Sequence, residues 1–192
     1  MTIYRAKRTY TPRTLLRDLR EIVAHTDDFH SAVNSDRVSR AFAERIMLTV
    51  TAVNDCRYCS VAHARMALRS GIAPEDVELL LGGEIGNVPP DEAPALLFAQ
   101  HYAGCGGQPD PAMVQILVET YGPETANDVL AHIRMITLGN LVGNTFDALL
   151  GRLRGQRPEG SRLGDEVAVL GLLVLATPVL GVAMAAQRLR RR

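Results

Sequence analysis

Apolar residues recur three and four positions apart along most of this chain, which is the spacing of one face of an α-helix. Runs in which apolar and polar residues alternate, the pattern typical of strands, do not occur in the sequence. The pattern predicts a first helix that begins at Thr11-Pro12, a loop from His25 to Asp36, and a second helix from Arg37 to Val53. The sequence therefore predicts an all-α fold.

Turn and cap residues divide the remainder of the helical region. Asn54-Asp55 is expected to end the second helix, because both side chains compete for backbone donors. A third helix follows from Cys56 to Ser70, and Gly71 suits its C-terminal cap. Further helices are predicted at 74–81, 91–103, 111–121 and 123–153, with Gly139 and Gly143 as weak points in the last one.

The composition changes after residue 153. Residues 154–166 are rich in Gly, Pro and Arg and predict a linker, whereas residues 167–186 contain no charged side chain. Twenty such residues could cross a bilayer as a helix, or could form a buried helix at an interface between subunits. The expected order is a basic N-terminal helix and loop at 1–36, a main helical domain at 37–153, the linker at 154–166, a hydrophobic helix at 167–186, and a basic tail at 187–192.

Charge and cysteine content exclude several classes of function. Lys plus Arg equals Asp plus Glu, at 21 each, so the chain lacks the overall positive charge typical of nucleic-acid binders. Three cysteines are too few for a secreted fold stabilised by disulfides. The first ten residues are polar and basic, without the apolar core of a secretory signal. We therefore expect a cytoplasmic location, with membrane association through Val167–Ala186 if that segment enters lipid.

The candidate chemistry lies between residues 44 and 63. Cys56, Cys59 and His63 are three and four positions apart, so they share one face of the predicted third helix. Cys56 at the helix start would have its thiolate stabilised by free backbone N–H groups. Glu44 lies on the preceding helix, and its carboxylate could orient the imidazole if the two helices pack antiparallel. These residues offer two thiols, a base and a carboxylate.

This segment resembles the core motif of the carboxymuconolactone decarboxylase and AhpD-like alkylhydroperoxidase family, on the strength of Glu44, Asn54, Cys56, Tyr58, Cys59 and His63. The resemblance implies an AhpD-like helical fold, here with an additional C-terminal hydrophobic helix, and assembly into homo-oligomers. It also implies a thiol-dependent peroxidase in which Cys59 attacks a hydroperoxide and Cys56 resolves the product. Glu44 and His63 would then relay protons. Tyr58 stands where characterised AhpD proteins have a histidine.

Other interpretations of the motif remain open. Cys56, Cys59 and His63 could bind zinc with Glu44 as a fourth ligand, although the chain shows no second ligand pair of the usual kind. We expect no metal and no cofactor, so electrons would come from a dithiol or a lipoyl-bearing donor. The alternative function is a membrane-tethered oligomer that senses redox state or binds a partner without significant turnover. The four histidines outside the motif are interpreted as surface or core residues.

Overall fold

A computed structural model describes the backbone of residues 7–156 and 158–190 and the side chains of residues 7–156 and 158–176. Within these ranges every regular element is an α-helix, which confirms the predicted all-α fold. The elements are α1 Pro12–Ala24, α2 Thr26–Asn34, α3 Arg40–Asn54, α4 Arg57–Arg69, α5 Pro74–Leu81, α6 Ala93–Gly104, α7 Pro111–Leu153 and α8 Leu163–Arg190.

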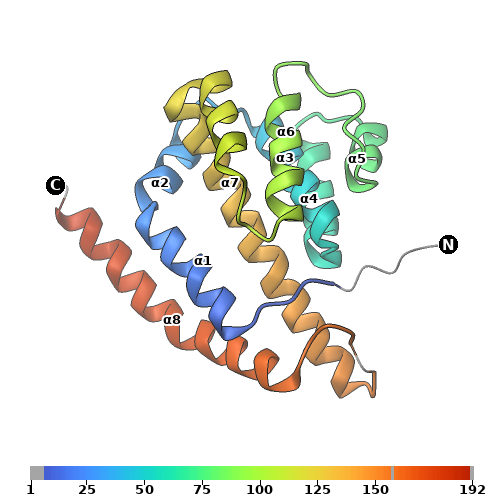
Figure 1. Cartoon of the computed structure of the whole chain (residues 1–192), viewed down its shortest axis with the longest axis vertical. Coiled ribbons are helices and arrows are strands. Elements are labelled where there is room, and N and C mark those ends of the chain that lie inside the picture. The colour runs from blue at the N-terminus through green and yellow to red at the C-terminus, as the bar shows by residue number, and fades with distance from the viewer. Residues whose placement is uncertain (1–6, 157, 191–192) are drawn as a thin grey trace.

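Helix α3 lies at the centre of the bundle and contacts α4, α5, α6 and α7. Figure 1 shows α3 to α6 gathered on one side of the long helix α7, with α1, α2 and α8 on the other side. Helix α7 therefore joins the two groups, since it contacts members of both, and α3 forms the middle of the first group.

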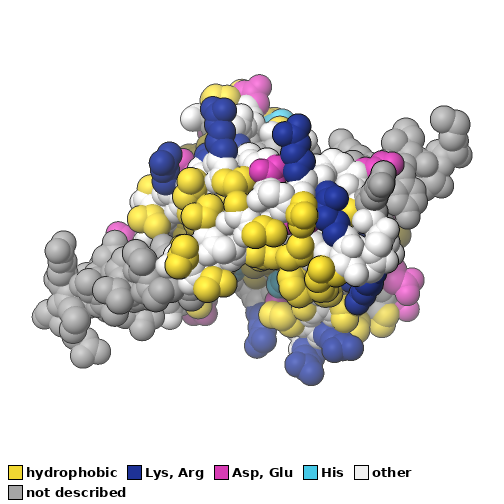
Figure 2. All heavy atoms as spheres, turned by 90° about the horizontal axis from the view of Figure 1, so that it is seen from below, with side chains coloured by type: hydrophobic (Ala, Val, Ile, Leu, Met, Phe, Trp, Pro, Cys, Tyr) yellow, Lys and Arg dark blue, Asp and Glu magenta, His cyan; other side chains and the backbone are white. Residues whose placement is uncertain are grey.

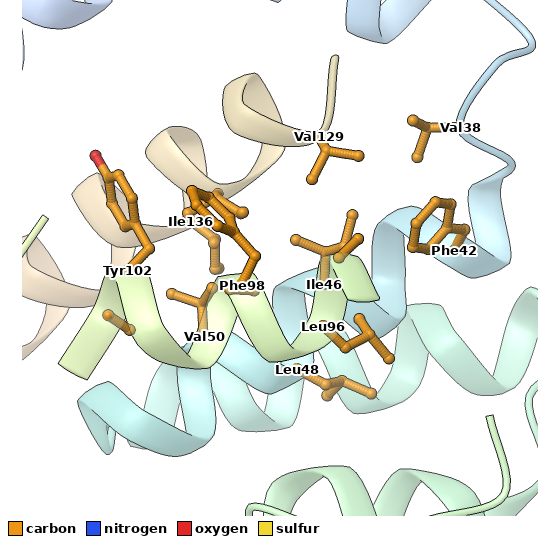
Figure 3. Close-up of a cluster of buried hydrophobic side chains, with 14 of the residues drawn as sticks. Val38, Phe42, Ile46, Leu48, Val50, Leu96, Phe98, Tyr102, Val129 and Ile136 are labelled. Carbon is orange, nitrogen blue, oxygen red and sulfur yellow. The ribbon is translucent and has the colours of Figure 1, made fainter. Parts of the chain in front are cut away.

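The main core forms where α3, α6 and α7 meet. Ile46, Leu48 and Val50 of α3 are fully buried, and Phe98 of α6 and Val129 of α7 pack into the same cluster (Figure 3). Burial of such aliphatic and aromatic side chains contributes about 1.5–3 kcal/mol each. The core thus fixes the position of α3, the helix that carries Glu44.

A smaller apolar cluster joins the N-terminal segment to the C-terminal helix. Tyr10 and Leu15 pack against Leu141 of α7 and Val169 of α8, and all four are buried. At the start of α8, the Glu166 carboxylate accepts hydrogen bonds from Nε of Arg152 at 2.8 and 2.9 Å. The first turns of α8 are therefore part of the folded domain.

Two connections differ from the sequence prediction. The predicted loop from His25 to Asp36 is wrong, because residues 26–34 form α2, which packs against α7 and buries Ala32. A nine-residue helix with one buried position leaves no periodic apolar face to detect. The linker predicted at 154–166 is too long, because α8 already begins at Leu163. The first turn of α8 is held to α7 by the bond between Glu166 and Arg152.

The predicted weak points of α7 are displaced. Gly139 and Gly143 lie within regular helix, whereas Gly122, just before Pro123, has φ 76° and ψ 161° and kinks the element. Pro123 has no backbone N–H to continue the helix, and glycine adopts a positive φ without steric cost. The kink therefore falls at the predicted boundary between two helices, although they run on as one element.

The hydrophobic helix predicted at 167–186 falls within α8, but the side chains of residues 177–190 lie outside those described. Among the described residues, no helix has the length and apolar content needed to span a bilayer. Val167, Val174 and Leu175 of α8 are largely exposed. Figure 2 shows the face of the molecule seen from below, where apolar side chains gather near the middle and Lys and Arg side chains stand at the edges. Membrane association stays a prediction.

Candidate functional site

The site is built on the hairpin between α3 and α4. Asn54 ends α3, and Asp55 takes a left-handed conformation with φ 52° that caps it. Cys56 then has extended backbone geometry and forms the N-cap of α4. Asp is one of the few residues that tolerate this left-handed conformation, so the predicted Asn54-Asp55 turn has a physical basis.

The two cysteines of the motif lie in direct contact. Their sulfur atoms are 2.6 Å apart in the reduced protein, and the backbone N–H of Cys59 donates a hydrogen bond of 3.4 Å to Sγ of Cys56. Cys56 is fully buried, whereas Cys59 is partly exposed. The predicted spacing therefore brings the thiols within reach of a disulfide, and Cys59 is the more accessible sulfur.

The two thiols differ in acidity. The hydrogen bond from Cys59 lowers the pKa of Cys56 to about 7, with help from the N–H groups of Cys59 and Tyr58 and from the charge of Lys7, although burial acts in the opposite direction. The same hydrogen bond, together with burial and the neighbouring charge, raises the pKa of Cys59. The pair therefore holds one proton on Cys59 near neutral pH while Cys56 is substantially thiolate.

Glu44 and His63 meet across the hairpin as the sequence predicted. Nδ1 of His63 lies 2.9 Å from Oε2 of Glu44, and both side chains are largely buried. The bond shows that α3 and α4 pack antiparallel around the turn at Asp55. Since His63 follows Cys59 by one helical turn, the oriented imidazole and the accessible thiol share a face of α4.

Helix α7 supplies two site contacts that the sequence analysis missed. A Cβ added to Gly143 would lie 2.9 Å from Sγ of Cys56 and 3.9 Å from Sγ of Cys59, so glycine allows α7 to approach the sulfur pair. Asn144 donates hydrogen bonds from Nδ2 to the backbone oxygens of Asn54 at 2.7 Å and Arg8 at 3.1 Å. Neither residue is part of a short sequence motif. Their contacts with the site follow from the register of α7 against α3.

The N-terminal segment also contributes to the site. Lys7 lies 3.8 Å from the Asp55 carboxylate and 3.6 Å from that of Asp147. Arg8 donates hydrogen bonds to the backbone oxygen of Ala103 and, at 3.3 Å, to Oδ1 of Asn54. A small cavity of about 100 Å³ lies between these residues and the end of α6. The basic residues predicted for a separate N-terminal region therefore stand beside the dithiol.

Tyr58 takes part in a surface network beside the thiols. Its hydroxyl accepts a hydrogen bond of 2.7 Å from Arg57 and lies 3.3 Å from Oδ1 of Asp147. The Arg57 guanidinium also covers its ring at 4.7 Å, and the Phe146 ring lies 6.3 Å away. Tyr58 thus behaves as a packing residue with a polar end.

The remaining candidate groups lie apart from this site. Cys105 is exposed, and its sulfur contacts the backbone oxygen of Tyr102 at 3.4 Å. A cavity of about 370 Å³ between α1, α6 and α7 is lined by Arg17, Tyr102 and Arg134 and by none of the motif residues. Within the described part of the chain, no three His, Cys, Asp or Glu side chains are arranged to hold a metal ion.

Comparisons with known proteins agree with the motif and the fold. Residues 20–86 match the model of the Carboxymuconolactone decarboxylase family. The fold is similar to that of an uncharacterized peroxidase-related protein from Silicibacter sp. TM1040, with a TM-score of 0.52 and 16% sequence identity over 77% of this chain and 75% of that one. At this identity the likeness concerns the fold. No curated protein matches the chain.

Proposed function

We propose that this chain is a thiol-dependent peroxidase of AhpD-like type. The match of residues 20–86 to the model of the Carboxymuconolactone decarboxylase family supports the proposal. The observation that carries the proposal is the pair of sulfurs 2.6 Å apart at the start of α4, beside a histidine bonded to a buried carboxylate. Two thiols, a base and its orienting carboxylate are the groups that reduction of a peroxide by a dithiol requires.

Cys59 is the proposed attacking thiol because it is partly exposed, whereas Cys56 is buried. The Cys56 thiolate, at 2.6 Å, accepts the Cys59 proton as the Cys59 sulfur attacks the O–O bond of a hydroperoxide. The bond breaks, Cys59 becomes a sulfenic acid, and the alkoxide leaves as an alcohol after taking a proton. Cys56 then gives up its proton and attacks the Cys59 sulfur, which forms the disulfide and releases water. Two thiols and one hydroperoxide thus yield one disulfide, one alcohol and one water.

His63 and Glu44 are the proposed proton-transfer groups. The Glu44 carboxylate orients the imidazole through Nδ1 and leaves Nε2 for proton exchange. His63 can therefore give a proton to the leaving alkoxide and take one from Cys56 when the disulfide forms. Proton transfer by a positioned group of this kind typically contributes ~10²–10⁴-fold to a rate.

We also propose an electron donor and an oligomeric state. A dithiol donor, such as a lipoyl group, would reduce the disulfide by exchange through a mixed disulfide, with Cys59 as the accessible sulfur. We also propose a homo-oligomer, since Tyr58, Val61 and Phe146 near the site are large exposed apolar residues. Light scattering on the purified chain measures the subunit count, and a monomer at micromolar concentration contradicts the assembly.

Steady-state consumption of an alkyl hydroperoxide with a dithiol donor tests the function. We expect turnover by the wild type and by Cys105→Ser, and loss of turnover in Cys59→Ser and Cys56→Ser. A protein that forms the disulfide stoichiometrically but shows negligible turnover with a panel of hydroperoxides and dithiols would instead support the redox-sensing alternative.

A further inference from the structure

The cavity of about 370 Å³ between α1, α6 and α7 has no role in the dithiol chemistry proposed above. Its volume lies in the range of small-molecule sites, about 300–1,000 Å³. Four charged side chains line it, two basic and two acidic: Arg17, Asp18, Glu21 and Arg134. Their charges cancel, so the ability of the cavity to hold an ion depends on which of them already have close partners.

Arg17 and Asp18 are fully engaged with each other and with the protein. Nε of Arg17 donates a hydrogen bond of 2.7 Å to Oδ1 of Asp18, and Nη2 donates one of 3.0 Å to the backbone oxygen of Gly106. The other carboxylate oxygen of Asp18 accepts a hydrogen bond of 2.8 Å from the Tyr10 hydroxyl. This ion pair therefore holds α1 to the turn after α6 and forms part of the cavity wall.

Arg134 of α7 is a largely buried cation without a close partner. Its side chain is 15% exposed, and its one ion pair within the described chain is a contact of 3.9 Å with Glu21, whose carboxylate is 54% exposed. That distance is too long for a hydrogen bond, and ion pairs exposed to solvent contribute little. A guanidinium is always charged and carries several N–H donors, and a buried charge normally has close acceptors. Arg134 is thus the cation that the cavity offers to a ligand.

The Tyr102 hydroxyl supplies a second donor on the same wall. The ring lies at the edge of the main core, and its hydroxyl points away from the other labelled side chains (Figure 3). Burial raises the pKa of Tyr102, so the hydroxyl keeps its proton, and the charge of Arg134 also acts on it. No described residue accepts that proton. Gly107 lines the cavity without a side chain, and a Cβ there would lie 3.6 Å from the hydroxyl oxygen.

The remaining wall favours an aliphatic body over a second charge. Ile22 of α1 and Val114 and Leu130 of α7 line the cavity beside the two donors. A carboxylate matches the planar guanidinium with two parallel hydrogen bonds. A phosphate dianion would bring a further negative charge next to the carboxylates of Asp18 and Glu21, which disfavours it.

We propose that this cavity binds an aliphatic monocarboxylate, with its carboxylate held by Arg134 and Tyr102 and its alkyl chain against Ile22, Val114 and Leu130. Two close hydrogen bonds to the ligand would replace the long contact between Arg134 and Glu21. The proposal does not depend on the proposed peroxidase function, because none of the motif residues lines the cavity.

Isothermal titration calorimetry of the full-length protein with octanoate as the probe tests the site. We expect one octanoate bound per chain, at least about tenfold weaker binding of 1-octanol, which has the chain without the charge, and no displacement of octanoate by inorganic phosphate. Arg134→Gln should weaken octanoate binding by about tenfold or more, and Tyr102→Phe by a smaller factor. Arg20→Gln is the matched control, because Arg20 lies exposed on α1 outside the cavity lining, and it should bind octanoate like the wild type.

Val114→Phe gives a second variant that keeps both donors and fills the apolar part of the cavity. It should also weaken octanoate binding by about tenfold or more, and circular dichroism shows whether each variant keeps its helices. Absence of octanoate binding, equal affinity for 1-octanol, displacement by phosphate, or equal affinities of Arg134→Gln and Arg20→Gln as folded proteins would each overturn the proposal. If Arg134→Gln does not fold, unchanged binding by Val114→Phe overturns it.

Discussion

Oε2 of Glu44 lies 2.9 Å from Nδ1 of His63, although 19 residues and a helix boundary separate them in the chain. The bond joins α3 and α4 across the hairpin, and it leaves Nε2 of His63 free for the proton transfer that we propose. Because α3 is held by the main core, this contact ties the position of His63 to the core of the fold.

Loss of this pair should slow catalysis without unfolding the protein. Glu44→Gln and His63→Gln keep the side-chain size but remove the charge or the proton acceptor, so each should lower turnover by ~10²–10⁴-fold. Steady-state peroxide assays measure the effect, and circular dichroism checks that the helices remain. Full turnover in both variants would mean that the pair has a structural role.

Gly143→Ala should disturb the dithiol, because the new Cβ would stand 2.9 Å from Sγ of Cys56. Overpacking of this kind costs about 1–3 kcal/mol. We expect a lower free energy of unfolding of the reduced protein and slower formation of the Cys56–Cys59 disulfide. Urea unfolding and thiol quantification after mild oxidation measure these two effects.

Gly139→Ala provides the matched control on the same helix. A Cβ at Gly139 meets no heavy atom within 4 Å, and alanine favours helix by up to ~1 kcal/mol over glycine. This variant should equal or exceed the wild type in stability and oxidise normally. Equal behaviour of both variants would contradict a special role for the close approach at Gly143.

Sequence patterns revealed the parts of the site that depend on local geometry. Cys56, Cys59 and His63 follow helical spacing, and the turn at Asn54-Asp55 predicts that the helix carrying Glu44 folds back toward His63. The family resemblance also predicted an AhpD-like helical fold. The similar solved structure and the family match agree with that prediction.

Contacts between distant helices could not be predicted in this way. The sequence marks Gly143 only as a weak point of a long helix and Asn144 as an ordinary position, and their roles at the site follow from the offset between α3 and α7. Lys7 and Arg8 look like part of a solvated basic segment, yet they bind groups at the end of α3. Such roles depend on packing register, which a single sequence does not encode in any short motif.

The pKa of the Cys56 thiol should depend on the hydrogen bond with Cys59. In a Cys105→Ser background, we expect thiolate absorbance of the reduced protein to appear with a midpoint near the Cys56 pKa of about 7. Cys59→Ala removes the S–H donor and should move the midpoint toward the free cysteine value of about 8.5. Absorbance at the thiolate wavelength against pH measures both. An unchanged midpoint in Cys59→Ala contradicts the shared proton.

The pKa shifts of Cys56 and Cys59 also predict how the free energy of unfolding depends on pH. Between the lowered Cys56 pKa of about 7 and the free value of about 8.5, the unfolded chain binds more protons than the folded one, so stability of the reduced protein should rise with pH. Above the free value the raised pKa of Cys59 reverses the sign, because the folded protein retains its proton. Urea unfolding from pH 6 to 10 should show a maximum that is absent from Cys56→Ser/Cys59→Ser.

Truncation separates the two roles of α8. Removal of everything after Leu153 exposes Tyr10 and Leu141 and takes away Val169 and Glu166, so this chain should be less stable. A chain that ends at Ala176 keeps those contacts and should fold normally. If Val167–Ala186 enters lipid, full-length protein should sediment with membranes while the Ala176 truncation stays in the supernatant; equal fractionation of both contradicts a membrane role.

The central claim is that one hydroperoxide converts the Cys56–Cys59 pair into one disulfide. Reduced protein mixed with one equivalent of an alkyl hydroperoxide, without any dithiol donor, tests it by mass spectrometry and quantification of the alcohol. We predict one alcohol and one Cys56–Cys59 disulfide per chain with Cys105 still free, and a sulfenic acid trapped by dimedone on Cys59 in Cys56→Ser. Unreacted peroxide, or a sulfenic acid trapped on Cys56 in Cys59→Ser but none on Cys59 in Cys56→Ser, would contradict this account.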